Sequence, residues 1–275
     1  MNSLQRNKKL LGTPYFIWCA FFIIIPLGMV FYYGLTDRNG SLTFENIAAI
    51  TQPEHIKGLF LALGLSFLST IICILLSYPL AMILSAMKVS TKSFVVFIFI
   101  LPMWMNFLLR TMAWQTLLEK TGVINSVLTF LNLPVLKIIN TPSAIVLGMV
   151  YNFLPFMVLP LYNCISKIDE NVINAARDLG ANSIKVFTRI ILPLSVPGII
   201  SGITMVFIPA LTTFVISKLL GGSKILLIGN IIEEEFTQAS NWNLGSGLSI
   251  VLMIFIIISI IITNIFDKGG ESNFL

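Results

Sequence analysis

Residues 58–87 read GLFLALGLSFLSTIICILLSYPLAMILSAM, a run of 30 residues without a charged side chain. A helix of about 20 apolar residues can cross the hydrocarbon core of a membrane, which is about 30 Å thick. Lipid offers the backbone no hydrogen-bond partner, so a single spanning segment must pair its own backbone groups, as a helix does. The run therefore predicts a transmembrane helix over about residues 59–86.

Five further uncharged runs lie on both sides of this segment. They cover residues 10–36, 93–109, 138–166, 190–217 and 236–266. The short run 93–109 is extended through Arg110, whose guanidinium would reach the far membrane interface. The first run is longer than a signal-peptide core and no small-x-small cleavage site follows it, which favours a retained helix. We predict an all-α integral membrane protein, a single domain over residues 1–275, with six spans at about 14–34, 59–86, 94–116, 142–163, 195–217 and 246–266.

The composition agrees with this fold class. Of 275 residues, 56% are hydrophobic and 11% are charged, whereas a soluble domain carries about 25% charged residues. An ordinary soluble enzyme is excluded, and the 17 scattered Lys and Arg residues form no basic stripe for nucleic acid. The three cysteines lie singly in apolar runs, and the one histidine is His55 in a polar loop. We therefore expect no metal site and no intramembrane catalytic site.

The distribution of Lys and Arg predicts how the spans are oriented. With the N-terminus inside, ten of these residues lie in cytoplasmic segments and seven lie in external ones. Both termini are therefore predicted to face the cytoplasm. The external stretch 115–141 has an apolar pattern of its own, which predicts a short interfacial helix.

The longest internal connection carries the most informative pattern. Residues 167–193 read KIDENVINAARDLGANSIKVFTRIILP. Asp169 is placed to cap a first helix, and Gly180 to end it in the left-handed conformation. The helix would present a small apolar face at i, i+3, i+4 and i+7, formed by Val172, Ala175, Ala176 and Leu179. Ser183 can cap a second helix that ends before Pro193, giving two short helices at about a right angle on the membrane face.

This loop resembles the EAA loop of bacterial ABC importer permeases. The shared pattern is two alanines, a glycine four residues after the second, and Ile-x-Leu-Pro after nine more residues. In that family the loop docks into a cleft of the ATP-hydrolysing subunit and passes its movement to the spans. The resemblance assigns this coupling role to Asn174, Ala175, Ala176, Asp178, Gly180, Ile190, Leu192 and Pro193. Asn174 stands where the family pattern begins with glutamate, which weakens any salt bridge expected there.

Four further stretches resemble permeases of the spermidine/putrescine type. They are LPMWMNFLLRTMAW at 101–114, GVIN at 122–125, YNFLPF at 151–156 and LLGG at 219–222. The resemblance implies a non-catalytic subunit with the type I ABC importer permease fold, in a bacterial cytoplasmic membrane, that moves polyamines by alternating access. The chain contains no GxxxxGK[ST] phosphate loop, so we expect no cofactor in it.

The resemblance also implies the partners of the chain. They are an ATPase homodimer that binds ATP and Mg, a second permease subunit, an extracytoplasmic solute-binding protein, the polyamine substrate and the lipid membrane, with no nucleic acid. Permeases for sulfate, molybdate or ferric ion share much of the pattern and stay as alternatives. A secondary transporter or channel is a more distant alternative, because such proteins usually carry ionisable groups within their spans.

Depth along the predicted spans selects candidates for a substrate pathway. Trp104, Tyr151 and Asn152 fall near the middle of the membrane, whereas Trp114 falls at the interface and is assigned to the aromatic belt. Aromatic faces attract ammonium groups, although the same residues could simply pack helices together. A second candidate is the acidic triplet Glu233, Glu234 and Glu235 in the last external loop. It could receive cations or contact the binding protein, or it could be a solvated patch.

Overall fold

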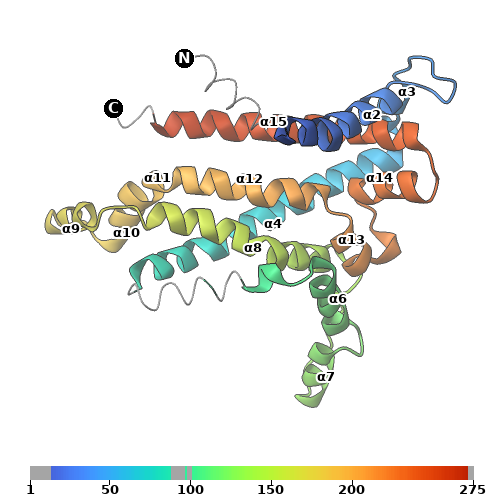
Figure 1. Cartoon of the computed structure of the whole chain (residues 1–275). Coiled ribbons are helices and arrows are strands. Elements are labelled where there is room, and N and C mark those ends of the chain that lie inside the picture. Colours follow the sequence, from blue (N-terminus) through green and yellow to red (C-terminus); the bar gives the residue numbers. More distant parts are fainter. Residues whose placement is uncertain (1–13, 88–96, 98–100, 272–275) are drawn as a thin grey trace, which may run out of the picture. The chain divides into compact units, whose positions relative to one another are not determined.

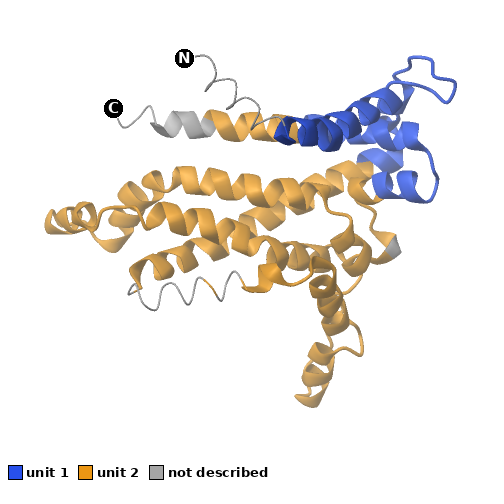
Figure 2. Cartoon of the chain, in the orientation of Figure 1, with its two compact units in different colours: residues 1–56, 231–255 blue, residues 57–230, 256–275 orange. Residues whose placement is uncertain are grey.

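The computed structural model of the chain describes residues 14–87, 97 and 101–271. Its described residues are helical and contain no strand beyond an isolated bridge between Thr36 and Leu42. The all-α fold predicted from the sequence is therefore confirmed. The chain divides into two compact units, one made of residues 1–56 and 231–255 and the other of residues 57–230 and 256–275 (Figure 2), and the single domain over residues 1–275 stays a prediction.

The first unit contains the N-terminal helix Pro14–Gly34, which has the length and composition of a membrane span. Its second half is α2 (Ile25–Gly34), and the first half of α15 (Trp242–Glu271) packs against it. A Cβ atom on Gly34 would lie 3.2 Å from the backbone nitrogen of Gly247, so the two helices approach closely at this point. The Asn243 side chain fixes the contact by donating to the carbonyl oxygen of Thr36 at 2.7 Å.

The second unit is built around three long helices, α4 (Pro53–Ala86), α8 (Pro142–Ile165) and α12 (Val196–Thr212). Figure 1 shows α8 and α12 running side by side, and these two helices are in extensive contact. A Cβ atom on Gly198 would lie 2.7 Å from Cβ of Cys164, so only glycine permits this approach. Small residues at such crossings are typical of helices that pack in membranes.

The third predicted span, 94–116, is not one continuous helix. Residues 94–96 and 98–100 lie outside the described residues, and the described part contains a 3-10 turn, Leu101–Trp104, followed by α6 (Phe107–Leu118). The break occurs at Met105 and Asn106, because the Asn106 side chain accepts hydrogen bonds from the backbone nitrogens of the next turn, at 2.9 and 3.3 Å. Asn106 thus acts as an N-cap and starts a new helix.

The Arg110 side chain is folded against the protein, where a side chain extended toward the membrane interface was expected. It is only 7% exposed, and it donates to the carbonyl oxygen of Pro102 at 2.7 Å. Its Nε has no hydrogen-bond partner among the described residues. The reason is the break at Asn106, which brings the Pro102 carbonyl within reach of a guanidinium that a straight helix would carry away from it.

The fifth predicted span, 195–217, is also divided. Helix Ser183–Leu194 precedes it and meets Val196–Thr212 at an angle of 63°. After Thr212 the chain leaves the helix and continues as α13 (Val215–Leu220). Among the described residues, four helices have the length and composition to cross a membrane: Pro14–Gly34, Pro53–Ala86, Pro142–Ile165 and Trp242–Ile265. The bent pair would make a fifth, and the six-span count stays a prediction.

Candidate functional site

The first helix of the loop 167–193, which we call the EAA-like loop, is α9 (Glu170–Asp178). The Asp169 side chain accepts a hydrogen bond from the backbone nitrogen of Asn171 at 2.9 Å, which confirms the predicted cap. Gly180 follows the helix with a φ of +82°, as predicted. Its N–H donates to the carbonyl of Arg177, and that of Ala181 to the carbonyl of Ala176, at 2.9 and 3.0 Å. This pair of bonds is the Schellman arrangement.

The second helix of the EAA-like loop differs from the prediction in two respects. Asn182, and not Ser183, is its cap, since the Asn182 side chain accepts from the backbone nitrogen of Lys185 at 2.9 Å. The helix also does not end before Pro193. It runs from α10 (Ser183–Val186) through a π turn, Phe187–Ile191, into α11 (Leu192–Leu194). Pro193, which has no backbone N–H to donate, directly follows the π turn, where the regular α-helical pattern of hydrogen bonds is already interrupted.

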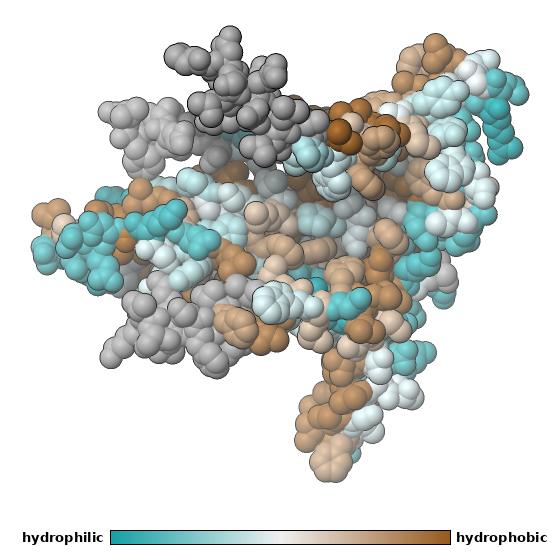
Figure 3. Space-filling model, viewed as in Figure 1, coloured by the Kyte–Doolittle hydropathy of each residue, from teal (hydrophilic) through white to brown (hydrophobic). Residues whose placement is uncertain are grey.

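The EAA-like loop presents apolar side chains on its surface. It lies at one end of the second unit, away from α6 and α13 (Figure 1). Leu179 is 89% exposed and Ile184 is 72% exposed, and Val172 and Ala175 are exposed as well. Figure 3 shows brown hydrophobic atoms among teal hydrophilic ones over this end of the molecule. Exposed apolar groups gathered in this way are typical of surfaces that bind another protein or a membrane.

The coupling candidates occupy different parts of this loop. Asn174, Asp178 and Gly180 are exposed, whereas Ile190, Leu192 and Pro193 are half-buried where the loop joins α12. Asn174 also lines a groove of about 530 Å³ with Glu170 and Arg177, beside the last turns of α4 and α8. A Cβ atom on Gly180 would meet nothing within 4 Å. Space is therefore available there for a partner.

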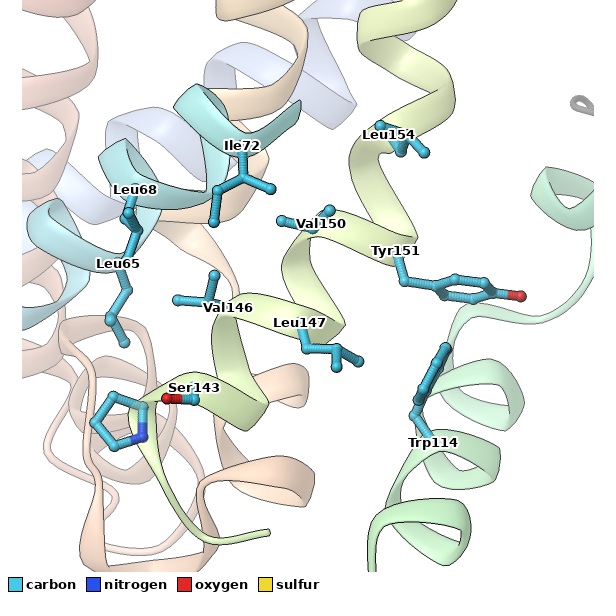
Figure 4. Close-up of a pocket in the computed structure, with 11 residues that line it drawn as sticks. Leu65, Leu68, Ile72, Trp114, Ser143, Val146, Leu147, Val150, Tyr151 and Leu154 are labelled. Atoms are coloured by element: carbon cyan, nitrogen blue, oxygen red, sulfur yellow. The ribbon is translucent and has the colours of Figure 1, made fainter. Parts of the chain in front are cut away.

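A second candidate site is an apolar groove of about 620 Å³ in the second unit (Figure 4). Trp114 of α6 and Tyr151 of α8 form one edge of the groove, with their ring centroids 5.2 Å apart in an edge-to-face contact. Its other walls are aliphatic: Leu65, Leu68 and Ile72 from α4, and Val146, Leu147, Val150 and Leu154 from α8. The sequence assigned Trp114 to the membrane interface and missed this pairing, because α6 and α8 are joined only through the tertiary fold.

The other pathway candidates do not join this pair. Trp104 is 77% exposed, and its ring meets the ring of Phe97 edge-on at 6.2 Å. Asn152 is buried, and its Nδ2 donates to the carbonyl oxygen of Gly148 at 2.8 Å. Its Oδ1 has no partner in the part of the chain that the structure describes. Adjacent residues on a helix point about 100° apart. Tyr151 therefore faces the groove, whereas Asn152 faces another side of α8, where it is buried.

The acidic triplet Glu233, Glu234 and Glu235 lies on a helix and not in a loop, contrary to expectation. This helix is α14 (Ile228–Thr237), and the three glutamates are half-buried on the part of it that belongs to the first unit. The Thr237 hydroxyl donates to the backbone carbonyl of Glu233 at 2.6 Å. No group of three or more His, Cys, Asp or Glu side chains among the described residues could hold a metal ion.

Long apolar helices joined by an exposed loop are typical of a multi-pass membrane protein. Residues 77–269 match the family described as binding-protein-dependent transport system inner membrane component, and the chain belongs to this family. It is similar to the spermidine/putrescine transport system permease protein PotB of Haemophilus influenzae, with 39% identity over 94% of this chain and 93% of the relative. It is 36% identical to the Escherichia coli protein of the same name, over 86% of this chain and 89% of that relative.

The fold is shared with solved ABC transporter structures. One is a chain of a bacterial alginate ABC transporter, crystallised in complex with an alginate pentasaccharide-bound periplasmic protein. It matches with a TM-score of 0.81 over 97% of this chain and 96% of that one, at 17% sequence identity. A second structure of a bacterial alginate importer matches with a TM-score of 0.79 over 98% and 97% of the two chains, at 19% identity. The chain is therefore a multi-pass inner-membrane transport subunit with the ABC importer permease fold.

Proposed function

We propose that this chain is one transmembrane subunit of an ABC importer that carries polyamines such as spermidine and putrescine into the cell. The observation that carries the proposal is the identity of 39% to a spermidine/putrescine permease over 94% of the chain. The subunit would work by alternating access, together with a second permease, an ATPase homodimer that binds ATP and Mg, and an extracytoplasmic binding protein.

The EAA-like loop is the proposed docking surface for the ATPase. Leu179 and Ile184 expose apolar side chains, and the neighbouring Ala175 and Gly180 leave room for close approach of a partner backbone. Burying such side chains in a cleft of the ATPase removes apolar surface from water, which favours association. Asn174 would contribute a neutral hydrogen-bonding group where the family has glutamate, so docking would rest on shape and apolar contact.

The apolar groove edged by Trp114 and Tyr151, which we call the aromatic groove, is the proposed contact for the substrate. A polyamine alternates ammonium groups with methylene segments. The groove offers an aromatic surface for the ammonium groups and an aliphatic surface for the methylene segments. The rings of Trp114 and Tyr151 can attract an ammonium group, while the aliphatic walls from α4 and α8 accept methylenes. Trp104 is proposed as a further contact along the path, since its ring is largely exposed. Glu233, Glu234 and Glu235 are proposed to receive cations or to contact the binding protein.

Uptake in cells that lack this chain tests the proposal. Radiolabelled spermidine, putrescine, sulfate, molybdate and ferric ion would be compared with and without the chain restored. We expect spermidine and putrescine uptake to return and the other solutes to stay unchanged. Restored uptake of sulfate, molybdate or ferric ion alone would replace the polyamine assignment by the corresponding importer.

A further inference from the structure

The bend at Ser195 joins the EAA-like loop to span α12. Helix Ser183–Leu194 and helix Val196–Thr212 meet there at 63°. Ser195 has backbone angles of φ −94° and ψ 0°, and its side chain is fully buried. Movement of the loop can reach the spans only if this bend is stiff, because a flexible joint would absorb the displacement.

A chain of two hydrogen bonds ties the bend to α4. The Ser195 hydroxyl donates to the carbonyl oxygen of Leu192 at 3.0 Å. Its single proton is then in use, so the hydroxyl of Tyr78 must be the donor in the hydrogen bond that joins these two side chains. Tyr78 comes from α4 and is buried. Hydrogen bonds in series polarise one another in a medium of low dielectric constant.

Tyr78 also contacts the loop side of the bend. Its ring meets the ring of Phe187 edge-on, with centroids 5.2 Å apart and an interplanar angle of 80°. Phe187 is the first residue of the π turn Phe187–Ile191, which precedes α11 and Ser195. A single side chain of α4 therefore touches the EAA-like loop through its ring, at Phe187, and the bend that follows the loop through its hydroxyl, at Ser195.

Helix α8 holds the same bend from another direction. The thiol of Cys164 lies 3.4 Å from the carbonyl oxygen of Leu194, which it approaches as a weak donor. One turn further on, the close contact of Gly198 with Cys164 and with the carbonyl oxygen of Pro160 leaves no space between α8 and α12. The bend is thus fixed to both α4 and α8.

We propose that Tyr78 is the positioning residue through which displacement of the EAA-like loop is delivered to α4, in an importer of the kind proposed above. The two helices that hold the bend also form the walls of the aromatic groove. Ile72 lines the groove from α4, and it precedes Tyr78 by six residues, or about 9 Å of helix. A stiff bend therefore connects the docking loop to the groove, and loss of the Tyr78 hydroxyl would loosen it.

The test uses the complete importer reconstituted in vesicles, with this chain, its second permease, the ATPase and the binding protein. The variant is Tyr78→Phe, which keeps the ring contact with Phe187 and removes only the hydroxyl. The matched control is Ser77→Ala, the neighbouring position of the same helix. Its buried hydroxyl has no hydrogen-bond partner in the described part of the chain. Measurements are co-purification of the ATPase, basal hydrolysis, spermidine-stimulated hydrolysis and spermidine uptake.

We expect Tyr78→Phe to keep ATPase co-purification and basal hydrolysis while stimulated hydrolysis and uptake fall about fivefold, the effect of losing one hydrogen bond. The control should match the wild type. Ser195→Ala should show at least the same loss, because it also removes the bond to the Leu192 carbonyl. The double variant should be no worse than Ser195→Ala, because the bond that Tyr78→Phe removes is already lost in that variant.

Three results would overturn the role of Tyr78. The first is normal stimulation and uptake in Tyr78→Phe, and the second is loss of ATPase co-purification, which would make the residue structural. The third is additive losses in the double variant. A wild-type complex that spermidine does not stimulate contradicts the proposed function instead, and this outcome is visible before any variant is compared.

Discussion

At the scale of single residues, the shape of the EAA-like loop depends most directly on Gly180. Its φ of +82° allows two backbone bonds to close the end of α9. A β-branched residue in this conformation is strained by about 1–2 kcal/mol, whereas asparagine adopts it more readily. Because a Cβ atom at Gly180 would meet nothing within 4 Å, the strain comes from the backbone and not from crowding inside this chain.

We predict that Gly180→Val leaves membrane insertion intact and abolishes uptake, because it changes the surface offered to the ATPase. The control Gly180→Asn keeps the left-handed conformation and should retain more activity than the valine variant. The measurements are co-purification with the ATPase and substrate-stimulated hydrolysis in reconstituted vesicles. Normal docking and normal stimulated turnover in Gly180→Val would contradict the proposal that this loop transmits movement.

The aromatic candidates give a second prediction at this scale. Trp104→Ala and Tyr151→Ala should each lower spermidine uptake about 2- to 30-fold, the effect of losing a cation–π contact of about 0.5–2 kcal/mol. Assembly with the ATPase should not change. Trp18→Ala is the control, since Trp18 lies on the N-terminal helix and stacks on Phe22. If both variants assemble and transport normally, neither residue is a substrate contact.

The sequence predicted local features of these residues better than distant ones. The cap at Asp169 and the stop at Gly180 depend on a few neighbouring side chains, and both were predicted. The choice between Asn182 and Ser183 as a cap could not be made, because both residue types cap helices and the two are adjacent. The pairing of Trp114 with Tyr151 joins two elements far apart in the chain, and no spacing in the sequence encodes it.

At the scale of elements, the apolar runs predicted the long helices but not their interruptions. Runs of apolar residues report how favourably a segment enters lipid, and they do not report whether its helix is continuous. One polar residue, Asn106, starts a new helix within the third run by capping its first turn. In the fifth run, the bend at Ser195 is stabilised by Tyr78, which comes from another helix. Neither cause is visible in hydropathy.

The short helix α7 (Val123–Phe130) gives a prediction at this scale. Asn125 is buried and makes three hydrogen bonds: its Nδ2 donates to the carbonyls of Glu119 and Leu136 at 3.0 Å each, and its Oδ1 accepts from the backbone nitrogen of Leu136 at 2.9 Å. Asn125→Ala should therefore destabilise the α7 segment by about 2–3 kcal/mol, since it leaves buried backbone groups unpaired.

Hydrogen exchange on the purified chain in lipid nanodiscs checks this prediction. The amide of Leu136 should exchange faster by about 30- to 150-fold in Asn125→Ala, the factor that corresponds to about 2–3 kcal/mol. Amides in α8 should not change. Ser126→Ala is the control, because its hydroxyl bonds only within the helix. Unchanged exchange at Leu136 would show that the segment after α7 is held in place by other contacts.

At the scale of the whole molecule, each compact unit combines segments that are distant in the sequence. The first unit joins the N-terminal helix to the first half of α15 through contacts such as that of Asn243 with Thr36. A reading of apolar runs treats every run as one equivalent span and has no means of detecting such units. The family match over residues 77–269 covers all of α4 from Ser77 onward, the EAA-like loop and α12. The elements that carry the proposed coupling therefore lie within the part of the chain that defines the family.

The orientation of the chain in the membrane is the prediction on which the coupling argument depends. Ten Lys and Arg residues lie in the segments predicted to be cytoplasmic and seven in those predicted to be external. Positive residues are retained on the cytoplasmic side during insertion, so reporter fusions at Ser90 and Ser183 should report the cytoplasm. A fusion at Ser223 should report the exterior. The EAA-like loop can meet a cytoplasmic ATPase only in this orientation, and an inverted pattern of reporters would therefore rule out its role in docking, whatever its shape.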